Sequence, residues 1–147
     1  MLAACVVAGW SLLGLADVSA ATGVPDSIRP ADLVGVWSVT MTVSYSTSGD
    51  VQVGDIKAEQ WNVSFESGLL KVKVVGGSGT TDTYQGSVRQ NGSVSLTFED
   101  RTHSVGVDVR GSGKELVGRR VVAASGMKTT GGHFGVVAVL YDIKLSR

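Results

Sequence analysis

The sequence has few of the residues that cross-link a chain, interrupt strands or bind polyanions. Only one of the 147 residues is cysteine and only two are proline. A single cysteine excludes a disulfide within the chain, so stability has to come from the core. Lysine plus arginine and aspartate plus glutamate number 13 each, without a basic cluster. We therefore expect no nucleic-acid partner, because phosphate binding depends on concentrated positive charge.

What the sequence does contain suits one globular domain. Hydrophobic residues make up 43% of the chain, and this length is enough for one real core. The 20 glycines, with scattered serine and threonine, are typical of many turns between short strands.

The first twenty residues differ from the rest. Residues Leu2 to Leu15 form an uncharged apolar run, and small residues at Val18-Ser19-Ala20 precede Ala21. This pattern predicts a cleaved signal peptide over 1–20, and the run is too short for a comfortable membrane span. We expect an exported protein, periplasmic or extracellular, although no lysine or arginine precedes the apolar run.

Two alternatives remain for this segment. It could be a buried N-terminal helix. Alternatively, Leu2-Ala3-Ala4-Cys5 resembles a bacterial lipobox, which would make Cys5 a lipid anchor. Ten apolar positions after Cys5 argue against the anchor, because a lipoprotein usually begins a polar tether there. After the signal peptide we expect a lead-in segment, 21–34, and a barrel domain, 35–147.

The chain from residue 37 onward alternates between apolar and polar residues. In the first run, Trp37 to Tyr45, the apolar residues and the serines and threonines take opposite parities, the pattern of a half-buried strand. A turn signal, Asn91-Gly92, separates two of the later runs. We predict eight strands, at 37–45, 58–66, 69–75, 82–89, 94–99, 103–110, 114–123 and 134–145.

Eight short strands in sequence order predict an all-β fold, an antiparallel up-and-down barrel, because consecutive strands pair and closure removes exposed edges. An outer-membrane barrel would need aromatic girdles and a polar interior. Few aromatics and a Ser/Thr/Lys second face favour a soluble barrel without a transmembrane span. Before the first strand, Pro30 to Val34 could form one helical turn whose Leu33 and Val34 plug one barrel end.

The first strand also carries a family resemblance. Gly35-Val36-Trp37 is similar to the Gly-x-Trp signature of lipocalins and related calycin barrels, and the eight-strand order extends the resemblance over most of the chain. The family implies that Trp37 closes one end and that a basic residue from the last strand packs over it. Arg147 is the candidate for that cation–π contact. The chain lacks the family's disulfides and long C-terminal helix, and looks more like small bacterial lipocalin-like domains.

A barrel of this size can be filled by its own side chains or can hold one small ligand. Gly86 and Gly118, at inward positions, would leave space and favour a pocket. Beyond the closure residues Gly35, Trp37 and Arg147, the candidate ligand-binding residues of the interior are Trp61, Phe65, Tyr84, Phe98, Arg120 and Tyr141.

Arg119 and Arg120 lie in the run with the weakest alternation. Whichever faces inward is costly unless it is paired. It could receive a ligand carboxylate, with Tyr84 or Tyr141 as a second donor. Alternatively, the strand is bulged and both arginines reach water.

Motifs for chemistry are absent from the sequence. His103 and His133 are the only histidines and lack metal-ligand spacing. No nucleophile-elbow sequence is present. We therefore expect no metal, no cofactor and no catalytic residues.

Three hypotheses follow. The first is an exported, non-catalytic, lipocalin-like barrel that binds a small apolar or amphipathic molecule. The second is a structural or protein-interaction barrel of the cell envelope with a filled core. The third is an enzyme that works in the cavity of the same scaffold. The sequence does not specify the oligomeric state.

Overall fold

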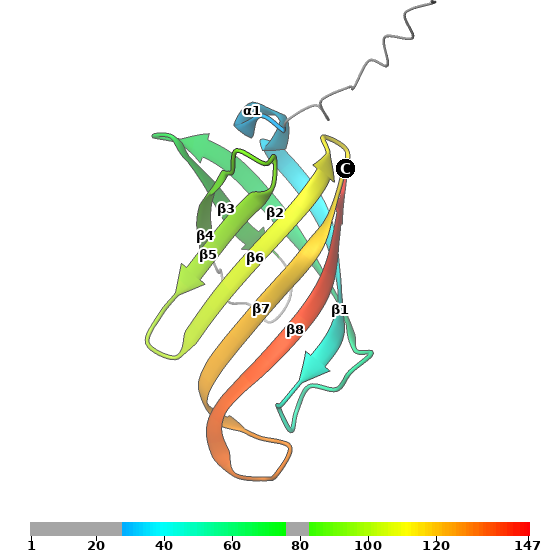
Figure 1. Ribbon diagram of the computed structural model, residues 1–147, viewed down its shortest axis with the longest axis vertical. Coiled ribbons are helices and arrows are strands. Elements are labelled where there is room, and N and C mark those ends of the chain that lie inside the picture. The colour runs from blue at the N-terminus through cyan, green and yellow to red at the C-terminus, as the bar shows by residue number, and fades with distance from the viewer. Residues whose placement is uncertain (1–27, 76–82) are drawn as a thin grey trace, which may run out of the picture.

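The protein is a closed antiparallel barrel of eight strands. The computed structural model describes residues 28–75 and 83–147. Each strand pairs with its neighbours in sequence, and β8 pairs with β1 to close the barrel (Figure 1). The elements are α1 (Pro30–Leu33), β1 (Gly35–Ser46), β2 (Ile56–Glu66), β3 (Leu69–Val75), β4 (Thr83–Val88), β5 (Val94–Glu99), β6 (His103–Ser112), β7 (Glu115–Lys128) and β8 (Phe134–Ser146).

This architecture confirms the predicted fold class and the order of the eight strands. Alternate residues of each strand enter a single core, as the period of two requires. In β1, for example, Trp37, Val39 and Met41 are buried while the residues between them are exposed. The register places Trp37 opposite Trp61 and Met41 opposite Ile143, so both neighbours of β1 contribute to the same core.

One end of the barrel, called here the α1 end, is closed by the short helix α1 (Figure 1). Leu33 is buried there, and its carbonyl oxygen accepts a hydrogen bond of 2.8 Å from the Trp37 indole N–H. This bond satisfies a polar group that would otherwise be buried unpaired. The prediction that Val34 also plugs the end is wrong, because Val34 is exposed and follows the helix as its C-cap.

The last residue of the chain covers this closure. The guanidinium carbon of Arg147 lies 4.4 Å from the centre of the Trp37 ring, as the lipocalin resemblance implied. Arg147 also donates a 2.6 Å hydrogen bond to the Val34 carbonyl. Gly35 has a φ of 128°, a conformation that favours glycine. A side chain there would come within 3.6 Å of the Arg147 guanidinium.

The opposite end, called here the distal end, lies where β1 ends and β2 and β8 begin. Near it, β1 departs from simple alternation. Val43 pairs with Tyr141, but Tyr45 pairs with Leu140, so Ser44 is an extra residue in a β-bulge. Tyr45 shares its parity with the buried residues of β1, and the prediction that it lies on the same buried face is wrong. The bulge reverses the face, and Tyr45 is exposed.

The seventh strand is longer than predicted. β7 continues to Lys128, where the sequence suggested a loop from residue 124, and a bulge interrupts its pairing with β8 between Ala124 and Met127. Ser125 and Gly126 interrupt the apolar–polar alternation there, so the sequence pattern did not predict that the strand continues to Lys128. The extended β7–β8 hairpin reaches beyond the barrel wall (Figure 1) and pairs with the β1–β2 connection through a bridge between Ser48 and Thr129.

The predicted role of two inward glycines is wrong. A side chain at Gly86 would overlap the backbone of Ser95, and one at Gly118 would overlap the backbone of Asp108. These glycines therefore allow close approach of neighbouring strands in a strongly curved wall. They do not open space for a ligand.

Within the described ranges, no helix is long and apolar enough to cross a membrane. The predicted signal peptide over 1–20, the lipobox at Cys5 and half of the lead-in segment, 21–27, lie outside those ranges. They remain predictions.

Candidate functional site

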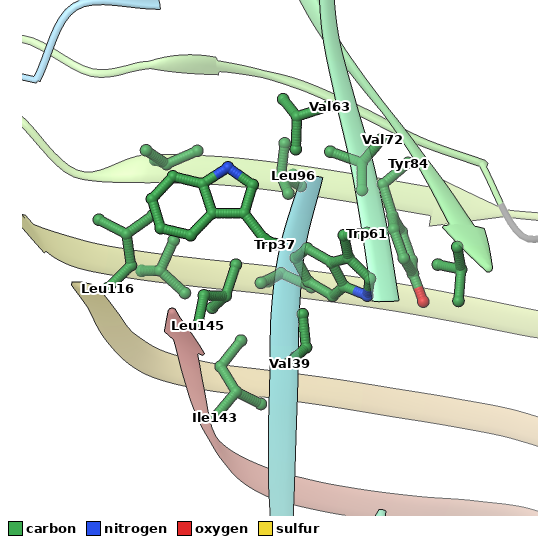
Figure 2. Close-up of a cluster of buried hydrophobic side chains, with 14 of the residues drawn as sticks. Trp37, Val39, Trp61, Val63, Val72, Tyr84, Leu96, Leu116, Ile143 and Leu145 are labelled. Carbon is green, nitrogen blue, oxygen red and sulfur yellow. The ribbon is translucent and has the colours of Figure 1, made fainter. Parts of the chain in front are cut away.

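The interior near the α1 end is packed with apolar side chains. A cavity of about 20 Å³ lies there, room for about one water molecule. Figure 2 shows the Trp37 indole beside Leu116 and Leu145 in this region. Ligand pockets for small molecules usually enclose about 300–1,000 Å³, so this cavity is a packing gap. Its lining residues are Leu33, Trp37, Trp61, Val63, Leu70, Val72, Val94, Leu96, Val109, Leu116 and Leu145.

Toward the distal end, the interior contains a buried arginine. Arg120 pairs with Val107 of β6 and Tyr141 of β8, both of which are buried, and only 9% of Arg120 is exposed. Arg119, its neighbour, points outward and lies 3.6 Å from the Asp142 carboxylate on the surface. The structure thus resolves the open alternative. Arg120 faces inward, and Arg119 reaches water.

Few hydrogen bonds hold the Arg120 guanidinium. Its Nη1 donates to a carboxylate oxygen of Glu59 at 3.3 Å and to the sulfur of Met41 at 3.1 Å. Its Nε is buried and has no hydrogen-bond partner among the described residues. A buried donor without a partner is unfavourable by about 1–3 kcal/mol, and more when it is charged. The guanidinium therefore retains the capacity to bind an acceptor.

Aromatic rings surround the rest of the guanidinium. Its carbon atom lies 5.6 Å from the ring centres of both Tyr84 and Tyr141. The centre of the Tyr84 ring lies 5.5 Å from that of Trp61 and 6.1 Å from that of Phe98, which it meets edge-on. Figure 2 shows Tyr84 beside Trp61. These rings stabilise a cation on their faces.

A second cation lies near one of these rings, that of Tyr141. Lys57, an exposed residue near the start of β2, places its Nζ 5.8 Å from the centre of the Tyr141 ring. Lys57, Glu59 and Trp61 alternate along β2 on the parity that enters the barrel. Lys57, Glu59 and Arg120, called here the inner charged cluster, carry two positive charges and one negative. The cluster can thus accept one more negative charge.

Sequence reasoning missed Lys57 and Glu59. Glu59 is mostly buried, with 16% of its side chain exposed, and it contacts both Arg120 and Trp61. The signal was their shared parity with Trp61, which predicts an inward direction. The predicted second strand began at residue 58, which left Lys57 outside it, and the predicted inward residues of that strand were the apolar ones.

The structure brings together most of the predicted ligand-binding residues. Trp61, Tyr84, Arg120 and Tyr141 meet inside the barrel, and half-buried Phe98 packs against Tyr84.

Phe65 does not belong to this group, and the prediction that it lies in the interior is wrong. It is 43% exposed. β1 begins at Gly35, which pairs with Val63, so no residue of β1 covers Phe65. Phe65 also lies toward the α1 end, away from Arg120.

The two histidines lie apart from the inner charged cluster. His133 is an exposed loop residue, and His103 lies 3.4 Å from Asp100 at the surface. Backbone N–H groups of Thr102 and His103 donate to Asp100 and lower the pKa of its carboxyl. Within the described ranges, no group of three His, Cys, Asp or Glu residues could hold a metal ion.

Comparisons with known proteins identify no family. No family model matches the chain, and no curated protein matches it.

Distant likenesses to solved structures exist. The monomer form of the PknI sensor domain from M. tuberculosis is 14% identical, with a TM-score of 0.46, over 78% of this chain and 86% of that one. A protein of unknown function from the DUF3598 family of Nostoc punctiforme is 12% identical, also with a TM-score of 0.46, over 82% of this chain. The match spans about half of the latter protein, 49%. At these values, neither likeness supports a functional argument.

Proposed function

We propose that this protein is a non-catalytic, lipocalin-like binding barrel that takes a small amphipathic molecule with an acidic head group into its distal half. The observation that carries the proposal is Arg120, a buried guanidinium whose Nε has no hydrogen-bond partner among the described residues. A ligand carboxylate would satisfy this donor through a charge-assisted hydrogen bond. The apolar part of the ligand would contact inward residues near the distal end such as Phe98 and Val122, which are only partly buried.

Arg120 suits this role because it resides on a strand in the barrel wall. Tyr141 on β8 and Tyr84 on β4 contact its guanidinium from other parts of the wall. A charged group fixed in this way loses little conformational freedom when it binds. The fork of an arginine also matches the two oxygens of a carboxylate, which favours an acid over an alcohol.

The test is a calorimetric titration of the full chain with octanoate and with octanol, a neutral molecule of similar length. We expect saturable one-to-one binding of octanoate. Arg120→Gln should weaken it at least tenfold, because a charge-assisted contact is lost. Arg119→Gln is the matched control, since it removes the same charge from the next residue on the outer face. An absence of heat with both compounds, or equal loss in the two variants, would contradict the proposal.

A second function is supported by the outer surface. Tyr45 of β1, Leu140 of β8 and Val121 of β7 are adjacent by register on the outside of the barrel. Tyr45 and Val121 are exposed. Together with the packed α1 half, this stripe fits a protein-interaction barrel of the cell envelope. Tyr45→Ser should abolish such an association and leave octanoate binding unchanged.

We also propose that the protein is exported, on the basis of the apolar run from Leu2 to Leu15 and the small residues before Ala21. The N-terminus of the protein recovered from the periplasm or the medium should be Ala21. A lipid-modified Cys5 at the N-terminus would instead support the anchor. Recovery of the uncleaved chain from the cytoplasm would contradict export.

A further inference from the structure

We infer that Glu59 is an internal substitute for the acid group of the ligand. Glu59 supplies a negative charge to Arg120, and it gives up that contact when the ligand carboxylate arrives. This inference rests on the proposed function and assigns Glu59 as a specificity-determining residue of the same site.

The contact between Glu59 and Arg120 is longer than a typical ion pair of its kind. One carboxylate oxygen lies 3.3 Å from a single guanidinium nitrogen, Nη1. Charge-assisted N–H···O bonds are usually about 2.7–2.9 Å, and arginine often binds carboxylates through two parallel bonds. Glu59 therefore neutralises Arg120 without using its full bonding capacity, and no described residue accepts a hydrogen bond from the Nε donor.

Glu59 keeps a hydrogen bond to Trp61 and access to water when it releases Arg120. Its second oxygen accepts a 3.0 Å hydrogen bond from the Trp61 indole N–H. Its side chain is 16% exposed, against 10% for Arg120, so water reaches the carboxylate more readily than the guanidinium. Loss of the contact is thus less unfavourable for Glu59 than it would be for Arg120, which needs a replacement anion.

The charges around the site fit an exchange of this kind. A ligand carboxylate beside Glu59 would place two negative charges near one guanidinium, and their repulsion opposes binding. Lys57, beside Tyr141, supplies the second positive charge that offsets it. The inner charged cluster would then bind one monoanion with no net charge remaining.

Glu59 should therefore restrict binding to ligands that compete with it for Arg120. A tethered competitor lowers apparent affinity by the fraction of molecules in which the site is free. Glu59→Gln removes the competing charge but keeps a side chain of similar size. We expect this variant to bind octanoate about tenfold more tightly than the unmodified protein, and to bind octanol no differently.

The experiment is a titration of octanoate and octanol into the full chain, Glu59→Gln and Glu66→Gln. Glu66→Gln is the matched control, because Glu66 lies on the same strand but pairs with Lys71 at the surface. A tenfold gain for octanoate in Glu59→Gln alone supports the inference. Equal or weaker octanoate binding would overturn it and make Glu59 a positioning residue for Arg120. A gain for octanol as well would also overturn it, since the substitution would then have opened space.

The outcomes separate the two proposals. If the unmodified protein binds octanoate through Arg120 but Glu59→Gln shows no gain, only the inference about Glu59 fails. If no variant binds octanoate, the proposed function and the inference fail together. Should Glu59→Gln not fold, Glu59→Asp decides the question, because its shorter side chain withdraws the carboxylate from Arg120. It should give a smaller gain in the same direction, and no gain would overturn the inference.

Discussion

The two halves of this barrel are built from the same strands but differ in how their buried polar groups are hydrogen-bonded. At the α1 end, Trp37 is 1% exposed, its indole N–H is bonded to Leu33, and the cavity among the apolar side chains is no larger than about one water molecule. In the distal half, Arg120 is also buried, at 9% exposed, but its Nε has no hydrogen-bond partner within residues 28–75 and 83–147. Trp37 at one end thus has its polar group satisfied, whereas Arg120 at the other is paired with Glu59 through one nitrogen only. This difference is the basis of our proposal that the first half stabilises the fold and the second binds a ligand.

The largest effect on the α1 end should come from Trp37→Ala. Replacing a buried aromatic residue with alanine leaves a cavity and typically reduces the free energy of unfolding by about 3–5 kcal/mol. Chemical denaturation measures the loss. At temperatures where the variant stays folded, octanoate binding should be unchanged. A variant that melts within a degree or two of the unmodified protein would show that Trp37 does not belong to the stabilising half.

Arg147→Ala tests the outer layer of the same closure. It removes the cation–π contact with Trp37 and the hydrogen bond to the Val34 carbonyl. Because Arg147 is exposed, we expect a loss of about 1 kcal/mol in the free energy of unfolding. Lys144→Ala, a change on the outer face of β8, is a control that should have less effect. Equal losses would mean that Arg147 adds nothing to the closure.

The smallest expected change in stability is that of Asp100→Asn, a substitution in the β5–β6 connection. Hydrogen bonds from the N–H groups of Thr102 and His103 lower the pKa of this carboxyl below its ordinary value of 3.8. The ionised form is favoured in the folded protein, so its stabilising contribution is complete above pH 3.8 and is lost as the pH falls through the lowered pKa. The melting temperature of Asp100→Asn should therefore approach that of the unmodified protein in this acidic window. A difference independent of pH would contradict this account.

The wall of the barrel was largely predictable, because each strand repeats a period of two that burial on one face imposes. The number and order of the strands follow from that pattern. Local irregularities were not predictable. Tyr45 continues the apolar parity of its run, and only the pairing of β1 with β8 reveals the bulge that turns it outward. Likewise, Ser125 and Gly126 break the alternation near the end of β7, and only its pairing with β8 shows that the strand continues past them.

The candidate site was predictable in part. Tyr84, Trp61 and Tyr141 could be placed inside from parity, but the choice between Arg119 and Arg120 needed the register of β7 against its neighbours. Glu59 was missed because a charge at an inward position is acceptable only with a partner from another strand. That partner, Arg120, is 61 residues away. Pairing over such a distance is a property of the closed barrel.

The most direct test of the central claim is the NMR signal of the Arg120 Nε–H group. Arg120→Lys assigns this signal in a ¹⁵N–¹H spectrum of the arginine side chains of the full chain. In the empty protein it should have the position of a weakly bonded N–H. We predict that octanoate moves it downfield to saturation, whereas octanol leaves it in place. A signal that octanoate does not move, or one already at a strongly bonded position in the empty protein, would contradict the assignment of Arg120 as the anchor for an acid.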